Sequence, residues 1–309
     1  MKRRVIQIAN STQLISLPRK WAIQHGIKKG DELEIKEEGS KIIVSTEKDY
    51  KVKVIEMNID GWGIMVPRLI HALYKKGVEE IKVNFSSEED MGAVQSALGK
   101  EAVGYEITNQ GNNFCEIKHI SGELEEFESI LKRTFLLLVS MSEQTLESIK
   151  KNNFNSLMNI AFLEEANNRF TTACRRFLNK GGEIKYFPRG PMYYILEGME
   201  NLADQYKYLC KHLYSLGKKN NKRESPISKN VINSFENVHA MLNRFYELFY
   251  KFDKNKLIEI AKKRKEVIDN LCSVIETSPK VQDRVLAHYL IVIAQEIFCF
   301  IGPYLVLNS

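Results

Sequence analysis

The sequence predicts a multidomain α+β protein that ends in a helical bundle, and three observations support this fold class. Residues 1–48 alternate apolar and polar side chains as strands do, with one short helical turn after Pro18. Residues 50–121 mix strand-like and helix-like stretches, and residues 122–309 repeat apolar side chains at intervals of three and four. We therefore expect a small β domain, an α/β module and a helical domain with these boundaries.

The composition is that of an ordinary soluble protein with a mild basic excess. The chain carries 45 Lys and Arg against 39 Asp and Glu, a formal net charge of +6, which does not by itself indicate a nucleic-acid partner. The excess is concentrated in residues 1–50 (+3) and 217–231 (+4). Five scattered cysteines without a CxxC pair predict neither disulfides nor a zinc site, and we expect small core residues in a reducing compartment. Because the N-terminus is too polar for a signal peptide, we expect a cytoplasmic protein.

The N-terminal unit contains two alternating segments. Residues 4–8 predict a strand, and residues 32–46 predict a hairpin that turns at "EEGS". A unit of about 45 residues without disulfides or a metal buries too little apolar surface to be stable alone. We therefore expect two copies to interleave their hairpins into one dimeric barrel.

The stretch "ANSTQLISLPRKWAIQHGIKKGDELEI" has a polar loop with "NS", a strand ending in Leu-Pro, a short helix and Gly-x-x-x-Gly-Asp before a strand. It resembles the AbrB/MazE/SpoVT swapped-hairpin family over roughly residues 2–48, which implies a homodimer that binds DNA. The side chains expected to neutralise phosphates are Lys2, Arg3, Arg4, Arg19 and Lys20. The chain departs from the AbrB pattern at Ala22 and Ile23, where arginines are expected. The alternative interpretation is a dimerisation module with a solvated basic edge.

Residues 50–121 predict the order β-α-β-α-β-β. Strands are expected over 51–59 and 79–85, and a hairpin over 102–120. Pro67 opens the first helix, and a Ser-x-x-Glu capping signal precedes the second. Neither GxGxxG nor GxxxxGK[ST] occurs in the chain, so no phosphate-binding loop is indicated. We expect this module to be a spacer or a sensor.

Six helices are predicted after residue 122. Their expected ranges are 123–149, 155–179, 191–216, 228–250, 253–276 and 279–307. The basic loop after Gly217 divides them into two groups of three, which predicts a duplicated three-helix bundle, with one irregular six-helix bundle as the alternative. The last helix is almost apolar enough to span a membrane, but Gln295 and Glu296 at its middle favour a buried bundle helix without membrane insertion.

Two helices, "NIAFLEEANNRFTTACRRFL" and "YYILEGMENLADQYKYLCKHLY", resemble those of the PhoU phosphate-uptake regulators, and the order of parts is similar to archaeal PhoU-domain proteins with an AbrB-type N-terminus. The resemblance implies pairs of carboxylates four residues apart that line the bundle and can hold iron or zinc. This spacing places both acids on one helix face. Glu200 and Asp204 match one complete motif, and Glu164 matches half of another whose second acid is replaced by Asn168.

Other metal and catalytic patterns are weaker. In the second half of the bundle, Ile291 and Gln295 stand where acids are expected, so that motif is lost. The alternative interpretation of the surviving acids is a polar or ion-paired helix face. A di-iron site needs Glu-x-x-His on two helices, and only Glu236 with His239 satisfies this on a predicted helix. Since no nucleophile and base pair can be argued either, we expect a protein that is not an enzyme.

Together the resemblances imply a negative regulator of phosphate uptake or phosphate-responsive transcription that binds DNA through its N-terminal domain. Its bundle would contact a phosphate-transporter ATPase or a signalling protein. The alternative from another class is a metal-binding protein-interaction adaptor that does not bind DNA. An antitoxin is less favoured, because toxin neutralisers of the MazE type end in a disordered tail and this chain ends in predicted helices.

Overall fold

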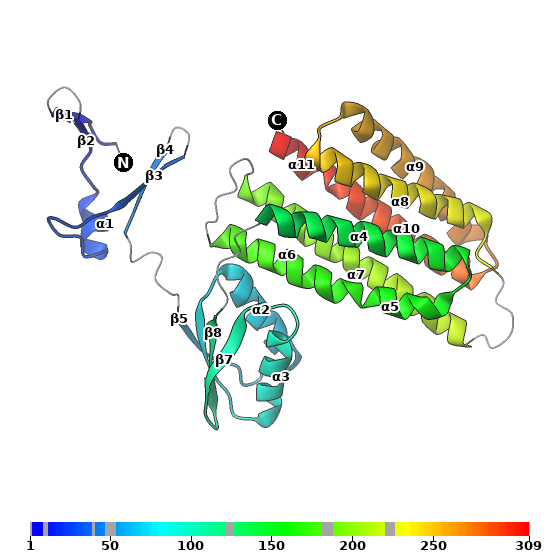
Figure 1. Cartoon of the computed structure of the whole chain (residues 1–309), viewed down its shortest axis with the longest axis horizontal. Helices are drawn as coiled ribbons and strands as arrows, with labels where there is room; N and C mark the ends of the chain where they lie inside the picture. Colours follow the sequence, from blue (N-terminus) through cyan, green and yellow to red (C-terminus); the bar gives the residue numbers. More distant parts are fainter. Residues whose placement is uncertain are drawn as a thin grey trace. The chain divides into compact units, whose positions relative to one another are not determined.

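The computed structural model describes residues 2–8, 12–38, 41–46, 54–120, 127–180, 188–219 and 226–308. The chain forms two compact units, Met1–Lys53 and Val54–Ser309 (Figure 1). The α/β module and the helices, predicted as separate domains, lie within the second unit.

The first unit consists of two hairpins and a short helix. β1 (Ile6–Ile8) pairs antiparallel with β2 (Thr12–Leu14), and β3 (Glu34–Glu38) pairs antiparallel with β4 (Lys41–Ser45). α1 (Arg19–Gln24) begins after Pro18 and is followed by Gly26, whose φ of 65° requires glycine. Its strands agree with the predicted ones. Residues 39–40 of the "EEGS" turn and the "NS" pair at 10–11 lie outside the described residues.

The α/β module has the predicted element order. Its elements are β5 (Val54–Asn58), η2 (Gly63–Met65), α2 (Val66–Lys76), β6 (Glu80–Asn84), α3 (Glu88–Leu98), β7 (Tyr105–Gln110) and β8 (Phe114–His119). The sheet order is β5-β6-β8-β7, and only β5 and β6 are parallel. α2 and α3 lie on one side of the sheet in Figure 1, and their buried residues share a core with those of the strands.

One capping detail differs from the expected Ser-x-x-Glu signal. Ser87 is the N-cap of α3, and its Oγ accepts a hydrogen bond from the backbone N–H of Asp90 at 3.2 Å. The preceding Ser86 instead donates from its backbone N–H and its Oγ to the Asp60 carboxylate. The two parallel strands β5 and β6 are thus tied together where they end.

The helical part contains the predicted helices with two breaks. Its helices are α4 (Phe127–Lys150), η3 (Phe154–Ser156), α5 (Leu157–Ala161), α6 (Leu163–Asn179), α7 (Arg189–Lys219), α8 (Lys229–Tyr250), α9 (Lys254–Thr277), α10 (Val281–Cys299) and α11 (Ile301–Asn308). The expected helix 155–179 is divided at Phe162. The expected helix 279–307 is divided at Phe300, because Pro303 has no N–H to donate to the carbonyl of Cys299.

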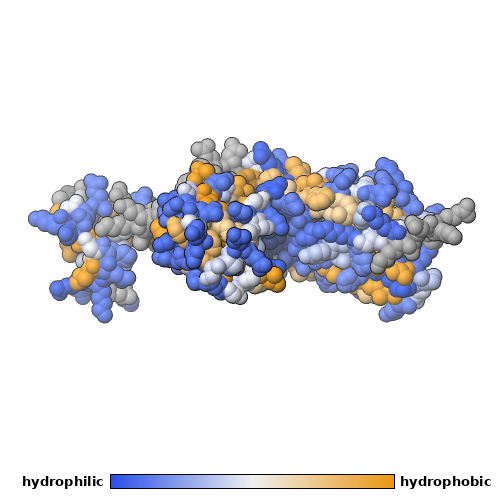
Figure 2. All heavy atoms as spheres, turned by 90° about the horizontal axis from the view of Figure 1, so that it is seen from below, coloured by the Kyte–Doolittle hydropathy of each residue, from blue (hydrophilic) through white to orange (hydrophobic). Residues whose placement is uncertain are grey.

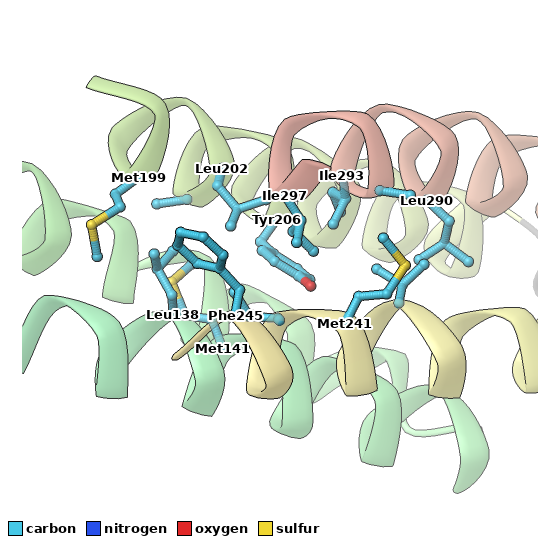
Figure 3. Close-up of a cluster of buried hydrophobic side chains, with 14 of the residues drawn as sticks. Leu138, Met141, Met199, Leu202, Tyr206, Met241, Phe245, Leu290, Ile293 and Ile297 are labelled. Atoms are coloured by element: carbon cyan, nitrogen blue, oxygen red, sulfur yellow. The ribbon is translucent and has the colours of Figure 1, made fainter. Parts of the chain in front are cut away.

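The helices pack in two groups around one core. α6 packs against α4 and α7, α9 packs against α8 and α10, and the groups meet where α4 and α7 contact α8 and α10. At the centre, the close-up in Figure 3 shows Met141, Tyr206, Phe245 and Ile293, from four different helices, facing one another. A duplication relating the two groups stays a prediction.

Val281–Asn308 is the one stretch among the described residues that is long and apolar enough to cross a membrane by length and composition. Two of its polar residues make contacts within the bundle. Asp283, which is buried, accepts hydrogen bonds from the N–H and Oγ of Ser228, and Gln295 accepts two from Arg264. These contacts agree with the expected bundle helix.

The cysteines depart in part from the expectation of core residues. Cys115, Cys174 and Cys210 are buried, whereas Cys272 and Cys299 are exposed, and all five are free thiols. Both exposed cysteines lie on outward faces of α9 and α10, where the helical period places them away from the core.

Arg176 joins the α/β module to the bundle. Its side chain extends from α6, is 3% exposed and donates to the carbonyls of Tyr74 and Val78 at 2.9 and 2.8 Å and to Glu79 Oε1 at 2.8 Å. Its guanidinium also lies 4.8 Å from the centre of the Tyr74 ring. Gly77 ends α2 with a φ of 87°, a conformation that strains residues with a side chain, and a Cβ there would also approach Lys180 Cγ to 2.7 Å.

Replacing Arg176 with Met is expected to lower the free energy of unfolding by about 3 kcal/mol, because it removes the charge that pairs with Glu79 and the donors to two carbonyls. Arg169→Met, on the same helix, changes a half-buried arginine for which the described residues show no hydrogen bond or ion pair, and should cost less than about 1 kcal/mol. Urea unfolding of the full chain measures both. Equal losses in the two variants would contradict the assigned contact.

Candidate nucleic-acid interface and carboxylate cluster

The five basic residues expected to contact DNA are all exposed on the first unit. Lys2, Arg3 and Arg4 precede β1, and Arg19 and Lys20 form the first turn of α1. Within the described part of the chain, none of these five side chains makes a hydrogen bond or an ion pair with another residue. Their charges are therefore available to neutralise phosphates.

The same unit exposes its apolar side chains. Nine of them are 42–69% exposed, namely Val5, Ile6, Ile8, Leu14, Ile15, Ile23, Ile35, Ile42 and Ile43. In the face shown in Figure 2, orange apolar side chains of this unit lie at the surface beside blue hydrophilic ones. No apolar residue among its described residues is buried. So much exposed apolar surface on so small a unit marks an interaction surface.

Strand register explains why these side chains gather. Ile6 faces Leu14 across the first hairpin, and Ile35 faces Val44 across the second. Since side chains two apart on a strand share a face, Ile6, Ile8 and Leu14 lie on one face of the first hairpin. In the second hairpin, Ile35, Ile42 and Val44 share a face, and Ile43 lies on the opposite one. Between the hairpins, Asp31 accepts a hydrogen bond from the N–H of Lys28 at 2.7 Å and fixes the turn that leads into β3.

The acids predicted from the bundle motifs lie on two neighbouring helices, α6 and α7. Glu164 Oε1 accepts hydrogen bonds from Asn168 Nδ2 at 2.5 Å and from Lys207 Nζ at 2.9 Å. The same Lys207 ammonium donates to Asp204 Oδ1 at 2.5 Å. Glu164 and Asp204 thus share one ammonium, and the structure brings together two of the three predicted residues.

The third predicted acid has a different cation. Glu200 accepts hydrogen bonds from Thr171 Oγ1 at 3.1 Å and from Arg175 Nη2, and the other terminal nitrogen of Arg175 donates to Glu197. The Arg175 side chain is fully buried. A guanidinium without water around it needs such partners, because an unpaired buried charge is costly.

Burial and charge act in opposite directions on this cluster. Burial lowers the pKa of Lys207, but its hydrogen bonds to Asp204 and Glu164 raise that pKa more, so its ammonium stays charged at neutral pH. Burial raises the pKa of Glu164, against the opposing effect of Lys207. The ammonium therefore compensates two carboxylates, one of which is poorly solvated.

This arrangement does not fit an iron or zinc ion. Over the described ranges, no three His, Cys, Asp or Glu side chains are placed to hold a metal ion. Lys207 and Arg175 occupy the positions beside Glu164, Asp204 and Glu200 that a metal would need. The metal site at these three acids stays a prediction. The spacing of Lys207 three residues after Asp204 was the sequence signal for the ion pair.

The Glu-x-x-His pair on α8 does not form a metal site either. Glu236 pairs with Lys150 at 2.8 Å, and His239 Nδ1 lies 3.0 Å from Ser142 Oγ. Tyr206 Oη also donates to this Ser142 Oγ, at 2.9 Å. Ser142 is fully buried, and the network joins α4, α7 and α8.

Comparison with protein families gives one match. Residues 6–52 match the model described as "Antidote-toxin recognition MazE, bacterial antitoxin". Residues 6–52 therefore form a MazE-like domain. No curated protein and no solved structure matches the chain significantly.

The match covers the MazE-like domain alone and bears out the predicted resemblance for that part of the chain. It agrees with a regulatory role, since MazE/AbrB-like domains typically bind DNA and dimerise. The resemblance of α6 and α7 to PhoU proteins, and an archaeal relationship, rest on the sequence motifs. Of the second basic stretch, 217–231, residues 220–225 lie outside the described residues.

We expect the full chain to be a dimer at micromolar concentration and Ile42→Asp to convert it to a monomer, because a carboxylate on the apolar face of the β3–β4 hairpin opposes its burial. Sedimentation velocity measures the change. Ile258→Asp on α9, where the native side chain is 44% exposed, is the matched control and should leave the dimer intact. A monomeric native chain, or a dimer unaffected by Ile42→Asp, would contradict the assigned interface.

Proposed function

We propose that the protein is a homodimeric DNA-binding regulator whose MazE-like domain contacts DNA. The observation that supports this most is the combination, in one small unit, of five exposed basic side chains with an apolar surface that has no core of its own. Dimerisation doubles the basic side chains on one body and buries the apolar ones. Affinity for DNA then comes mainly from phosphate neutralisation.

We propose that the second unit binds the partner or effector that controls this regulator. Its α/β module is held to the bundle by Arg176, so a partner or effector bound to either part acts on one packed body. The quoted motifs of α6 and α7 support phosphate as the regulated nutrient, with negative regulation of phosphate uptake in the cytoplasm. A phosphate-transporter ATPase or a signalling protein is the proposed partner of the bundle.

The alternative function is a protein-interaction adaptor that does not bind DNA. It is favoured by Ile23, which is 69% exposed and follows α1's first turn where the AbrB pattern has arginine. An apolar residue at this position suits a protein partner better than a phosphate.

Arg3→Ala combined with Arg4→Ala removes four charges from the dimer and should lower the slope of log affinity against log salt by up to about 3.6. The fold should survive, because both residues precede β1. Fluorescence titrations with duplex DNA at several salt concentrations measure the slope. Lys254→Ala with Lys262→Ala, exposed on α9, is the matched control and should leave it unchanged. Equal losses in both variants would contradict the assignment of DNA binding to the first unit.

DNA crosslinked to the protein in cells should include defined sites, and their occupancy should differ between phosphate-rich and phosphate-poor growth. Genome-wide recovery and sequencing measures this. Defined sites that do not respond to phosphate would support a DNA-binding regulator of another nutrient. Absence of any enriched site, together with intact dimers, would favour the adaptor.

A further inference from the structure

Two carboxylates from different helices converge on a single nitrogen in the bundle. Glu164 Oε1, on α6, and Asp204 Oδ1, on α7, both lie within 3 Å of Lys207 Nζ. The side chains of Glu164 and Lys207 are only 8% and 15% exposed, so water contributes little to their solvation. Asp204 is more exposed, at 31%. The repulsion between the two carboxylates is only partly screened there, and the Lys207 ammonium between them offsets it.

The surroundings supply a further oxygen. Asn168, one turn after Glu164, is 8% exposed and donates from Nδ2 to Glu164, while its Oδ1 is buried and has no hydrogen-bond partner among the described residues. Because Nδ2 faces Glu164, the amide must rotate by half a turn to offer Oδ1 to an ion there. An amide oxygen and two carboxylates are the ligands that hard divalent cations prefer. The native chain has no room for such an ion, since the Lys207 ammonium occupies the point where the two carboxylates converge.

We propose that Lys207 is a built-in counter-ion that takes the place of a divalent cation between Glu164 and Asp204, and that the Glu164, Asp204 and Asn168 side chains become a divalent-cation site when its charge is removed. The ammonium and a divalent ion exclude each other, because both require the same carboxylate oxygens and repel at this distance. In the native chain, the α6–α7 contact is therefore independent of metal supply. This inference is independent of the proposed DNA binding.

The test uses the full chain with Mn²⁺ as the probe. Lys207→Met keeps the length of the side chain and removes the charge, and Lys211→Met, one turn further along α7 and exposed, makes the same change outside the cluster. The Lys207→Met protein should unfold at least about 3 °C below the native chain in EDTA and should regain stability with Mn²⁺. For the native chain, and likewise for Lys211→Met, the unfolding temperature in Mn²⁺ should equal that in EDTA.

Direct binding gives the second readout. Electron paramagnetic resonance of free Mn²⁺ should show one ion per Lys207→Met chain, bound at least about tenfold more tightly than by the native chain. Adding Asp204→Asn to Lys207→Met should abolish that binding. If Lys207→Met folds only when Mn²⁺ is present during refolding, the site is also supported.

Two results would overturn the proposal. One is a native chain, purified without chelator, that carries iron or zinc in elemental analysis and loses it on Glu164→Gln, because Lys207 would then not be the resident cation. The other is a Lys207→Met chain that is as stable as the native one in EDTA and gains no affinity for Mn²⁺. Elemental analysis of the native chain needs no variant to fold, and Glu164→Gln is needed only to assign a bound metal to this cluster.

Discussion

Two adjacent buried guanidinium groups hold the second unit together. Arg175 extends from α6 towards Glu197 and Glu200 on α7, and its neighbour Arg176 extends to the end of α2 and to Glu79. Successive residues on a helix point about 100° apart, so one turn of α6 reaches two different neighbours. Because a buried guanidinium is tolerated only with its full set of acceptors, these contacts fix both the spacing of α6 and α7 and the position of the α/β module.

The first unit, in contrast, has no buried apolar core among its described residues. It forms regular hairpins and a helix, yet its described apolar residues remain exposed, whereas the second unit has two hydrophobic cores of its own. A chain of about 50 residues cannot enclose enough apolar surface by itself, and a second copy is the simplest way to cover it. In the proposed homodimer, dimerisation and DNA binding are physically linked, since pairing also brings two sets of basic side chains together.

In the charged cluster between α6 and α7, the acids found from the sequence pattern pair with a lysine. Glu164 and Asp204 are positioned as facing carboxylates, but Lys207 supplies the positive charge between them. A lysine costs rotamer entropy to immobilise, but it does not dissociate as a bound ion does. The result is a helix pair whose stability is set by the chain itself.

The sequence by itself determined the elements whose cause is local. Alternation predicted the strand at 4–8 and the hairpin at 32–46, strand-like and helix-like stretches predicted the β-α-β-α-β-β order, and the three-and-four spacing predicted the helices. These periods follow from backbone geometry, whereas the pairing of β1 with β2 was not predicted. The division at Phe300 was not predicted, because the apolar run continues through it. Pro303 is the sequence signal that could have indicated the break. The acids Glu164, Glu200 and Asp204 could be found from their spacing along each helix.

Tertiary structure alone decided which charges meet. Lys207 lies 43 residues from Glu164, and Arg176 reaches acceptors about 100 residues earlier in the chain, so no local period connects these partners. Their pairing depends on how α6 is rotated against α7 and α2, which is set by the packing of the cores on either side. A single buried contact of this kind depends on the whole packed fold, which is the physical reason that the sequence pattern indicated acids but not the cations beside them.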